Sequence, residues 1–291
     1  MNLHDNSTLR YGRLLIACPD QPGIVAKVTR ILFDHHANIT ESAQYSTDPY
    51  QGRFFMRIAF TIDAASETLD TLHNALNPFA EAHAMKISLT LPEKKKKMAI
   101  FVSKEEHCLL ELLWQQQMGT LEAEIAMVIS NHPDHQKTVE AMGFPYYYVP
   151  VDKHKKEIAE KQQMDLIKDQ VDFIVLARYM QILSPYLVSA FPNQIINIHH
   201  SFLPAFVGAK PYERAFDRGV KIIGATAHYV TEELDAGPII EQDVQRIHHG
   251  YSASEMKATG RLIERTVLAK AVKWHVEDRI LVHDNKTIVF A

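Results

Sequence analysis

The hydrophobic pattern of the chain changes near residue 98. Before that point apolar and polar residues alternate, as in RFFMRIAFTI (residues 53–62), where every second side chain from Phe54 is apolar. An alternation of period two predicts strands that bury one face and expose the other. After residue 98 the apolar runs are continuous, as in MAIFVS and VDFIVLA, and such runs are typical of parallel strands covered on both faces. The pattern therefore predicts two domains of different architecture.

The N-terminal part of the chain predicts a small βαββαβ domain. The strand RLLIAC (residues 13–18) precedes a helix in which Ile24, Val28 and Ile31 recur at helical spacing. Two strands follow, over ANIT and RFFMRIAFTI, and a second helix then leads into the alternating segment MKISLTL. Half-exposed strands in this order fit a ferredoxin-like antiparallel sheet with two helices on one face. We expect this domain to span residues 1–92.

The lysine-rich segment PEKKKK marks the predicted domain boundary, with residues 93–97 as a linker and 98–291 as the second domain. The chain carries a net charge of −4 and has a pI near 6.5. An acidic chain favours a solvated linker over a basic patch, so we expect neither nucleic acid nor a membrane as a partner. Beyond the linker, continuous apolar strands alternate with helical stretches, which predicts a Rossmann-like, mostly parallel α/β domain.

Composition narrows the class of protein without identifying it. No apolar run reaches the ~18 residues of a membrane span and no signal-peptide pattern opens the chain, so we expect a cytoplasmic protein.

Cys18 and Cys108 lack the spacing of a metal site. Sixteen histidines invite a metal hypothesis, but several stand in adjacent pairs whose side chains diverge, and NHPDH (residues 131–135) has no cysteine nearby. We therefore expect no metal and no cofactor.

Polar residues gather where one predicted strand ends, in IINIHHSFLPAF (residues 195–206). Side chains two apart on a strand share a face, so Asn197 and His199 are expected to point together and His200 to point away. An amide can donate a hydrogen bond to a developing oxyanion, and an imidazole can transfer a proton, so this pair suits acyl chemistry. The segment ELDAG adds Asp235 beside a glycine that permits a tight turn. The same residue types are also common as strand-end caps and turn residues.

Longer segments around these residues carry a resemblance to a known family. NIHHSFLPAFVG and GATAHYVTEELDAGPII, together with VISNHPD and ARYMQILSP upstream, resemble segments of the formyl-tetrahydrofolate hydrolase and transferase family. The resemblance covers the second domain from about residue 98 onward. It implies that Asn197, His199 and Asp235 form a catalytic triad that acts on the formyl group of 10-formyltetrahydrofolate.

The same resemblance places the folate substrate between two segments. One segment follows the predicted strand VDFIVLA, and its backbone groups are expected to read the pterin ring. The other segment is the loop that leads to Asp235. His228, on the strand before this loop, is expected to contact the triad residues and hold them in position without contacting the substrate. The residues implied in substrate binding are Met180, Gln181, Ile182, Leu183, Thr231 and Leu234.

The family contains both hydrolases and formyltransferases, and the triad does not separate them. A transferase that formylates glycinamide ribonucleotide needs a phosphate-binding helix N-terminus after the first strand of the domain. Here the sequence is FVSKEEHCLLELL, which has no glycine and places Glu105 and Glu106 where they would repel a phosphate. A transferase acting on methionyl-tRNA would be expected to carry a basic C-terminal domain, which does not follow the helix predicted over residues 254–276. Water is therefore the expected acceptor.

The segment DQPGIVAKVTRILFDHHANITESAQYS resembles an ACT domain, a small fold that binds amino acids between paired copies. The resemblance implies ligand contacts at Asp20, Gly23 and Asn38, methionine and glycine as effectors, and a homodimer or homotetramer. An ACT domain joined to a formyl-transfer domain implies hydrolysis of 10-formyltetrahydrofolate to formate and tetrahydrofolate, which supplies formate for one-carbon and purine metabolism. An ACT unit that serves only in dimerisation, a formyltransferase with an amine acceptor, and a non-catalytic folate or amino-acid sensor remain as alternatives.

Overall fold

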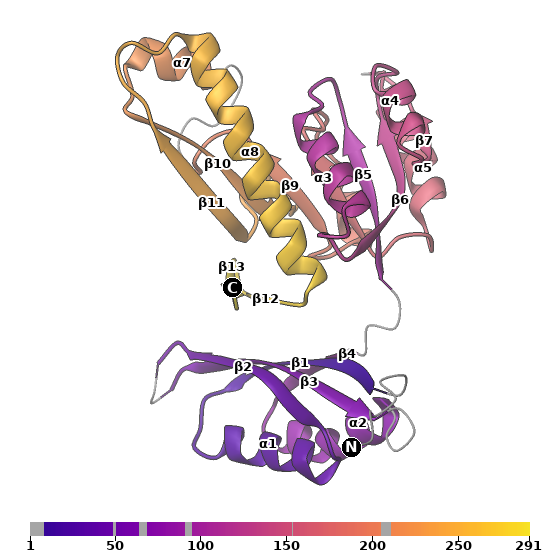
Figure 1. The fold of residues 1–291 in the computed structure, drawn as a ribbon, viewed down its shortest axis with the longest axis vertical. Helices are drawn as coiled ribbons and strands as arrows, with labels where there is room; N and C mark the ends of the chain where they lie inside the picture. Colours follow the sequence, from indigo (N-terminus) through magenta and orange to yellow (C-terminus); the bar gives the residue numbers. More distant parts are fainter. Residues whose placement is uncertain (1–8, 49–50, 64–68, 91–94, 153, 205–210) are drawn as a thin grey trace, which may run out of the picture. The chain divides into compact units, whose positions relative to one another are not determined.

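A computed structural model describes the chain except for residues 1–8, 49–50, 64–68, 91–94, 153 and 205–210. The chain divides into two compact units (Figure 1). The first comprises Met1–Lys94, Asp278–Leu281 and Ile288–Ala291, and the second comprises Lys95–Glu277 and Val282–Thr287. None of the described helices is long and apolar enough to cross a membrane.

The first unit is an antiparallel sheet with two helices on one face (Figure 1). Its strands lie in the order β2-β3-β1-β4, so β3 and β1 are central. This is the predicted ferredoxin-like arrangement, and the prediction is confirmed. The elements are β1 (Leu9–Pro19), α1 (Ile24–Asp34), β2 (Asn38–Ser46), β3 (Arg53–Asp63), α2 (Leu69–Ala82) and β4 (Lys86–Thr90).

The helix-covered face of this sheet holds the core of the first unit. Phe54, Met56 and Ile58 follow one another at every second position of β3, and all three belong to one buried cluster with Val28 and Leu32 of α1. Fully burying one such side chain stabilises the fold by about 1.5–3 kcal/mol. The alternation along β3 therefore reports which face the helices cover.

The opposite face of the sheet carries charged residues that bind the segment beginning at Asp278. Arg57 is only 3% exposed, and its Nε donates a hydrogen bond to the main-chain oxygen of Asp278 at 2.9 Å. Arg279 pairs with Glu41 at 2.9 Å. Because of these bonds the segment groups with the first unit, so the prediction that all of residues 98–291 belong to the second domain is wrong near the C-terminus. The alternation along β3 indicates which side chains point away from the core, but it does not indicate which segment of the chain covers them.

The second unit is built on a seven-stranded sheet in the order β11-β10-β9-β8-β5-β6-β7. The strands from β9 to β7 are parallel, and β10 and β11 are antiparallel to their neighbours, as expected for a mostly parallel α/β domain. The strands are β5 (Lys96–Val102), β6 (Ala123–Ser130), β7 (Tyr146–Tyr148), β8 (Phe173–Ala177), β9 (Ile195–His199), β10 (Ile222–Tyr229) and β11 (Ile239–Arg246). The helices are α3 (His107–Gln117), α4 (Gln136–Ala141), α5 (Lys156–Ile167), α6 (Pro185–Ala190), α7 (Pro211–Arg218) and α8 (Ala253–Val276), and the short strands β12 (Ile280–His283) and β13 (Lys286–Val289) pair after α8.

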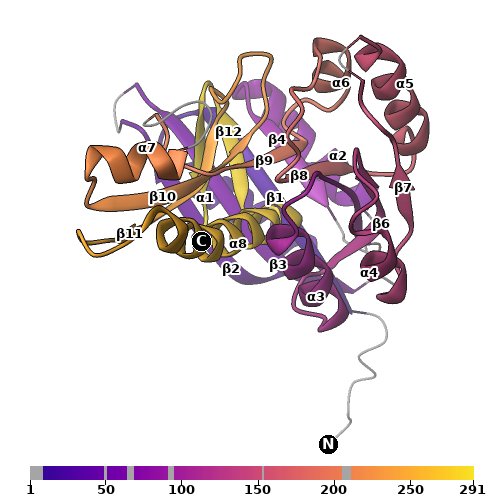
Figure 2. The same cartoon turned by 90° about the horizontal axis from the view of Figure 1, so that it is seen from above.

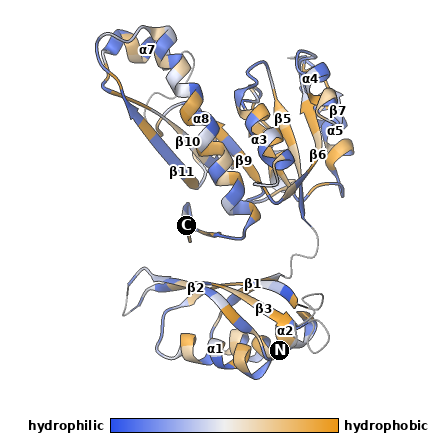
Figure 3. Cartoon of the chain, viewed as in Figure 1, coloured by the Kyte–Doolittle hydropathy of each residue, from blue (hydrophilic) through white to orange (hydrophobic). Residues whose placement is uncertain are grey.

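Helices cover both faces of this sheet. α5 and α6 lie on one side, where they bury side chains of β5, β6 and β8, and α3 and α8 lie on the other (Figure 2). All five residues of β8 are buried, and β5 and β6 are apolar along most of their length, in contrast to the mixed surfaces of the helices (Figure 3). The continuous apolar runs of the sequence therefore correspond to strands with two covered faces.

The second sheet begins earlier than predicted. The backbone N–H of Lys97 donates to Oδ2 of Asp172 at 2.6 Å, and the N–H of Asp172 donates to the main-chain oxygen of Lys97 at 2.8 Å. Lys96 donates through Nζ to the main-chain oxygen of His275 at 2.9 Å. Both lysines lie in β5, so the predicted linker over residues 93–97 is too long. Backbone hydrogen bonds are independent of side-chain type, and long lysine side chains can reach solvent from the end of a strand.

Candidate active site

A cavity of about 510 Å³ lies at the carboxyl ends of β8 and β9. This edge of a parallel sheet is the usual place for a ligand in an α/β fold. The loop after β8, the end of β9 and the loop after β10 line it. The structure places every residue that the sequence assigned to the triad, its support and the substrate in this lining: Met180, Gln181, Ile182, Leu183, Asn197, His199, His228, Thr231, Leu234 and Asp235.

Strand pairing positions Asn197 next to His228. β9 and β10 are antiparallel, and their register places these two residues directly opposite each other. Nδ1 of His228 lies 2.9 Å from the main-chain oxygen of Tyr229, which requires a proton on Nδ1. In the neutral ring Nε2 then accepts a hydrogen bond from the Asn197 amide, whose nitrogen lies 3.2 Å away. The amide is thereby oriented and keeps its second N–H for a substrate oxygen.

Asp235 joins the two histidines from the loop between β10 and β11. Its Oδ2 lies 3.2 Å from Nδ1 of His199, and its Oδ1 lies 3.7 Å from Nε2 of His228. The hydrogen bond from His199, followed by the interaction with His228, holds the pKa of Asp235 well below its usual range. The carboxylate is therefore ionised at neutral pH. Nε2 of His199 is buried and has no hydrogen-bond partner among the described residues, so this atom is available to a substrate.

Gly237 allows the loop of Asp235 to lie against the end of β10. A Cβ atom at this position would be 1.9 Å from the main-chain oxygen of Tyr229, and that strand backbone cannot yield without losing its hydrogen bonds. We predict that Gly237→Ala shifts the loop and lowers kcat/KM by about 10²-fold, since small displacements of a catalytic group have effects of this size. Steady-state kinetics tests this prediction, with Gly250→Ala as the control. A Cβ there would meet only the exposed His248 ring at 3.1 Å, and equal losses in both variants would contradict the account.

His200 does not point away from the site as predicted. It lines the same cavity, and its ring stacks on that of His199 with centroids 5.2 Å apart and an interplanar angle of 27°. β9 ends at His199, so the strand alternation that separates successive side chains does not extend to the next residue. Both histidines of the HH pair therefore belong to the cavity wall.

Sequence reasoning also missed a buried charged cluster behind the cavity. Glu264 is 1% exposed, and it accepts hydrogen bonds from the Tyr212 hydroxyl at 2.7 Å and from Nε2 of His107 at 2.8 Å. Nε of Arg178, a cavity residue, lies 3.3 Å from the same carboxylate. Although burial acts to raise the pKa of Glu264, His107 and Arg178 hold it below its ordinary value. The signal in the sequence is a glutamate on the apolar face of α8, where Gly260, Val267 and Leu268 are buried.

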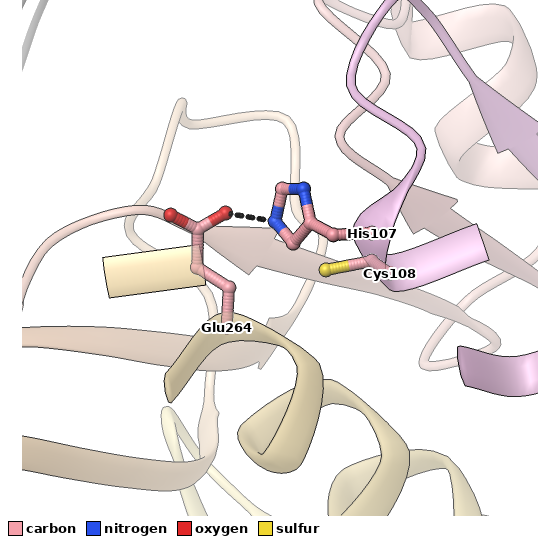
Figure 4. A group of neighbouring side chains, drawn as sticks. All are labelled: His107, Cys108 and Glu264. Atoms are coloured by element: carbon pink, nitrogen blue, oxygen red, sulfur yellow. Dashed lines mark hydrogen bonds and ion pairs between the residues drawn. The ribbon is translucent and has the colours of Figure 1, made fainter. Parts of the chain in front are cut away.

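Glu264 also belongs to the one group of described residues with a geometry that could suit a metal ion. His107, Cys108 and Glu264 bring their ligand atoms within 4.8 Å of one another (Figure 4). Burial raises the pKa of the Cys108 thiol well above its ordinary value, whereas metal ligation requires the thiolate. The carboxylate is already engaged by three partners. These residues fit a hydrogen-bonded core better than a metal centre.

A second cavity, of about 820 Å³, lies over the N-terminal end of α3 and is lined in part by Glu105 and Glu106. It does not include the triad. Glu105 accepts a hydrogen bond from Nζ of Lys257 at 2.9 Å and pairs with Arg261. The Glu105 carboxylate thus pairs with the two positively charged side chains that could otherwise bind a phosphate.

The three residues assigned to an amino-acid ligand lie on different parts of the first unit. Asp20 accepts a hydrogen bond from the Ser46 hydroxyl at the end of β2, and Gly23 begins α1 with a φ of 93°. Asn38 opens β2, eight residues before Ser46, which corresponds to about 27 Å along the strand. Within one chain Asp20 and Asn38 therefore do not form a single site.

Known proteins resemble both units of the chain. Residues 96–272 match the formyl transferase family, and residues 12–77 match the ACT domain. The chain is 58% identical over 280 residues to a formyltetrahydrofolate deformylase of Bacillus subtilis (strain 168), covering 96% of this chain and 93% of that protein. It is 47% identical to the deformylase of Mycobacterium tuberculosis (strain ATCC 25618 / H37Rv), over 96% and 90% of the two chains. The crystal structure of a formyltetrahydrofolate deformylase from Pseudomonas syringae pv. tomato str. DC3000 superposes with a TM-score of 0.92 at 50% identity, covering 100% of this chain and 97% of that one.

Proposed function

The chain belongs to the formyl transferase family and carries an ACT domain, and on this premise we propose that it hydrolyses 10-formyltetrahydrofolate to formate and tetrahydrofolate. The observation that carries the proposal is the arrangement of Asn197, His199 and Asp235 at one cavity. Relatives named formyltetrahydrofolate deformylase match nearly the whole chain, the ACT domain included. An enzyme of this kind acts on the C–N bond of a formamide.

The cavity has the character of a site for a flat heterocycle. Met180, Ile182 and Leu234 have large apolar side chains that are exposed at its walls. Exposed apolar side chains around a cavity of this volume favour a ligand with an apolar ring. We assign the pterin ring of the folate to the space between the loop after β8 and the loop after β10, where backbone groups can bind its polar edge.

The triad supports attack at the formyl carbon. When the oxygen of water bonds to this carbon, the carbonyl oxygen becomes an oxyanion, which the free N–H of Asn197 and Nε2 of a protonated His199 can stabilise. Asp235 accepts from Nδ1 of His199, fixes the ring and balances its positive charge. The bond from carbon to N10 then breaks, and N10 takes up the proton that the attacking water has given up. One oxyanion donor typically contributes about 10²–10³-fold in rate. None of these steps requires a metal or a redox cofactor.

The contacts of Glu105 favour water over a phosphorylated amine as the acceptor. A ribonucleotide amine would need cations and free N–H groups at the N-terminus of α3. Lys257 and Arg261 instead pair with Glu105, and a negative charge at this helix end opposes a phosphate. Transfer to glycinamide ribonucleotide is therefore the less favoured function.

The ACT domain supports regulation by an amino acid and assembly of the chain into pairs. We propose methionine and glycine as effectors, and a homodimer or homotetramer formed through the ACT domains. Because Asp20 and Asn38 lie apart within one chain, an effector that contacts both residues needs two chains. Ligand binding and assembly are then expected to be linked, with an effector shifting the oligomeric state measured by light scattering.

The experiment that tests the function is an assay of formate release from 10-formyltetrahydrofolate in amine-free buffer, with and without methionine and glycine. We expect formate and tetrahydrofolate in equal amounts, at a rate that an effector changes. Turnover that requires an added amine, such as glycinamide ribonucleotide, would instead identify a formyltransferase. A melting temperature shifted by folate and amino acids without any formate would identify a sensor.

A further inference from the structure

Two stacked histidines in the cavity wall face groups of opposite charge. Nδ1 of His199 lies 3.2 Å from the carboxylate of Asp235. The neighbouring ring of His200 lies beside Arg178, whose positive charge acts on it, and its centroid is 6.4 Å from that of Tyr212. Adjacent titratable groups whose environments differ in this way are a common basis for dividing acid and base roles.

Arg178 is held in place by the buried cluster of Glu264. The guanidinium Nε lies 3.3 Å from the Glu264 carboxylate, which Tyr212 also binds. His107 binds the same carboxylate (Figure 4). Arg178 has a φ of 63° directly after β8, a conformation that non-glycine residues adopt rarely. The fold therefore fixes a positive charge next to His200.

The His200 ring has an unused hydrogen-bonding capacity. Its contacts with the described residues are ring contacts with His199 and Tyr212, and no described residue forms a hydrogen bond with its nitrogen atoms. Burial, and then the charges of Arg178 and His199, lower the pKa of His200 to about 4, against the opposing effects of Glu264 and Asp235. At neutral pH the ring of this cavity residue is uncharged, and one of its two nitrogen atoms carries a lone pair. A pKa of this size is that of a carboxylate, a common general base.

Hydrolysis makes two demands that one imidazole cannot meet in the same step. Donation from Nε2 of His199 to the oxyanion requires a protonated Nε2, whereas proton removal from water requires a lone pair. We propose that His200 is a further catalytic residue, whose free ring nitrogen takes a proton from the attacking water while His199 and Asn197 bind the oxyanion. This inference rests on the proposed hydrolysis.

The step balances in atoms and charge. The water oxygen bonds to the formyl carbon, one water proton passes to His200, and the carbonyl electron pair moves to oxygen. When the tetrahedral intermediate collapses, the bond from carbon to N10 breaks and N10 receives the proton from His200. Formic acid then loses its remaining acidic proton to solvent, and His200 is neutral for the next cycle.

The test compares water with hydroxylamine, a nucleophile that is uncharged at neutral pH and attacks carbonyl groups without prior deprotonation. We expect His200→Asn to lower formate release by about 10²–10⁴-fold, the usual contribution of a general base. The same variant should form formohydroxamate from 10-formyltetrahydrofolate and hydroxylamine at close to the wild-type rate, because the nitrogen of the added hydroxylamine carries the proton that N10 needs when the bond from carbon to N10 breaks. His199→Asn should lose both reactions, since both pass through the oxyanion.

His249→Asn is the matched control, because His249 is exposed and belongs to another adjacent histidine pair. Melting temperature and the Kd of tetrahydrofolate confirm that each variant folds and binds, and His200→Gln provides a second variant if the first is unstable. Normal formate release by a folded His200 variant would overturn the inference, and so would equal loss of both products. A wild-type protein that releases no formate would instead contradict the proposed function.

Discussion

Replacing Asp235 by asparagine is expected to lower kcat for formate release by about 10³–10⁴-fold, the range known for loss of the aspartate that orients a catalytic histidine. The substitution keeps the shape of the side chain but removes the negative charge 3.2 Å from Nδ1 of His199. The amide N–H₂ can also face this atom, which would leave His199 with the wrong tautomer and without support for its cation. The loss should appear in kcat of the purified variant.

The low pKa of Asp235 means that its charge does not depend on pH near neutrality. Its pKa lies well below the usual range, first because His199 donates to the carboxylate and then through the interaction with His228, so Asp235 does not titrate near neutrality. Acidification from pH 8 to about 6 therefore leaves Asp235 ionised. Asn74→Ala, at an exposed position on α2, is the control variant, purified and assayed in the same way. An Asp235→Asn variant that keeps a tenth or more of the wild-type kcat would contradict the role assigned to this residue.

Replacing Glu264 by alanine is expected to lower the free energy of unfolding of the second unit by about 3–5 kcal/mol, because the change leaves a buried charge without its partner. Arg178 would lose the carboxylate 3.3 Å from its Nε, and Tyr212 and His107 would lose their hydrogen-bond acceptor. Urea denaturation followed by circular dichroism measures this effect. Since its partners lower the pKa of Glu264, the contribution is present above the pKa of the unfolded carboxyl group and is lost as pH falls through the folded pKa.

Glu124→Gln provides the comparison for that experiment. Glu124 pairs with Lys97 at 3.4 Å, and both side chains are about half exposed. An exposed pair of this kind contributes about 0–1 kcal/mol. Similar losses in the Glu124 and Glu264 variants would show that the buried cluster does not contribute as we describe.

The two sheets could be predicted from the sequence because each leaves a different burial pattern. β3 alternates since only one of its faces meets helices, and β8 is wholly apolar since both of its faces do. The two domain matches agree with this division. The local periodicity of apolar residues is therefore enough to predict the architecture of each domain.

Features that depend on contacts between distant segments could not be predicted. Arg57 alternates like a solvent-facing residue, yet the segment at Asp278 covers it, because a charge can be buried when partners from elsewhere in the chain satisfy it. The same holds for Glu264. His200 was misplaced for a local reason, the end of β9 at His199. The residues of the cavity were found because longer motifs surround them, and not from spacing alone.

The most direct test of the account is formate release in water enriched in oxygen-18. Hydrolysis forms a new bond between the formyl carbon and a water oxygen, so the formate released from 10-formyltetrahydrofolate should carry one heavy oxygen and appear without any added amine. Mass spectrometry of the formate measures this incorporation. Transfer of the formyl group only to an added amine, with no labelled formate, would contradict the central claim that water is the acceptor.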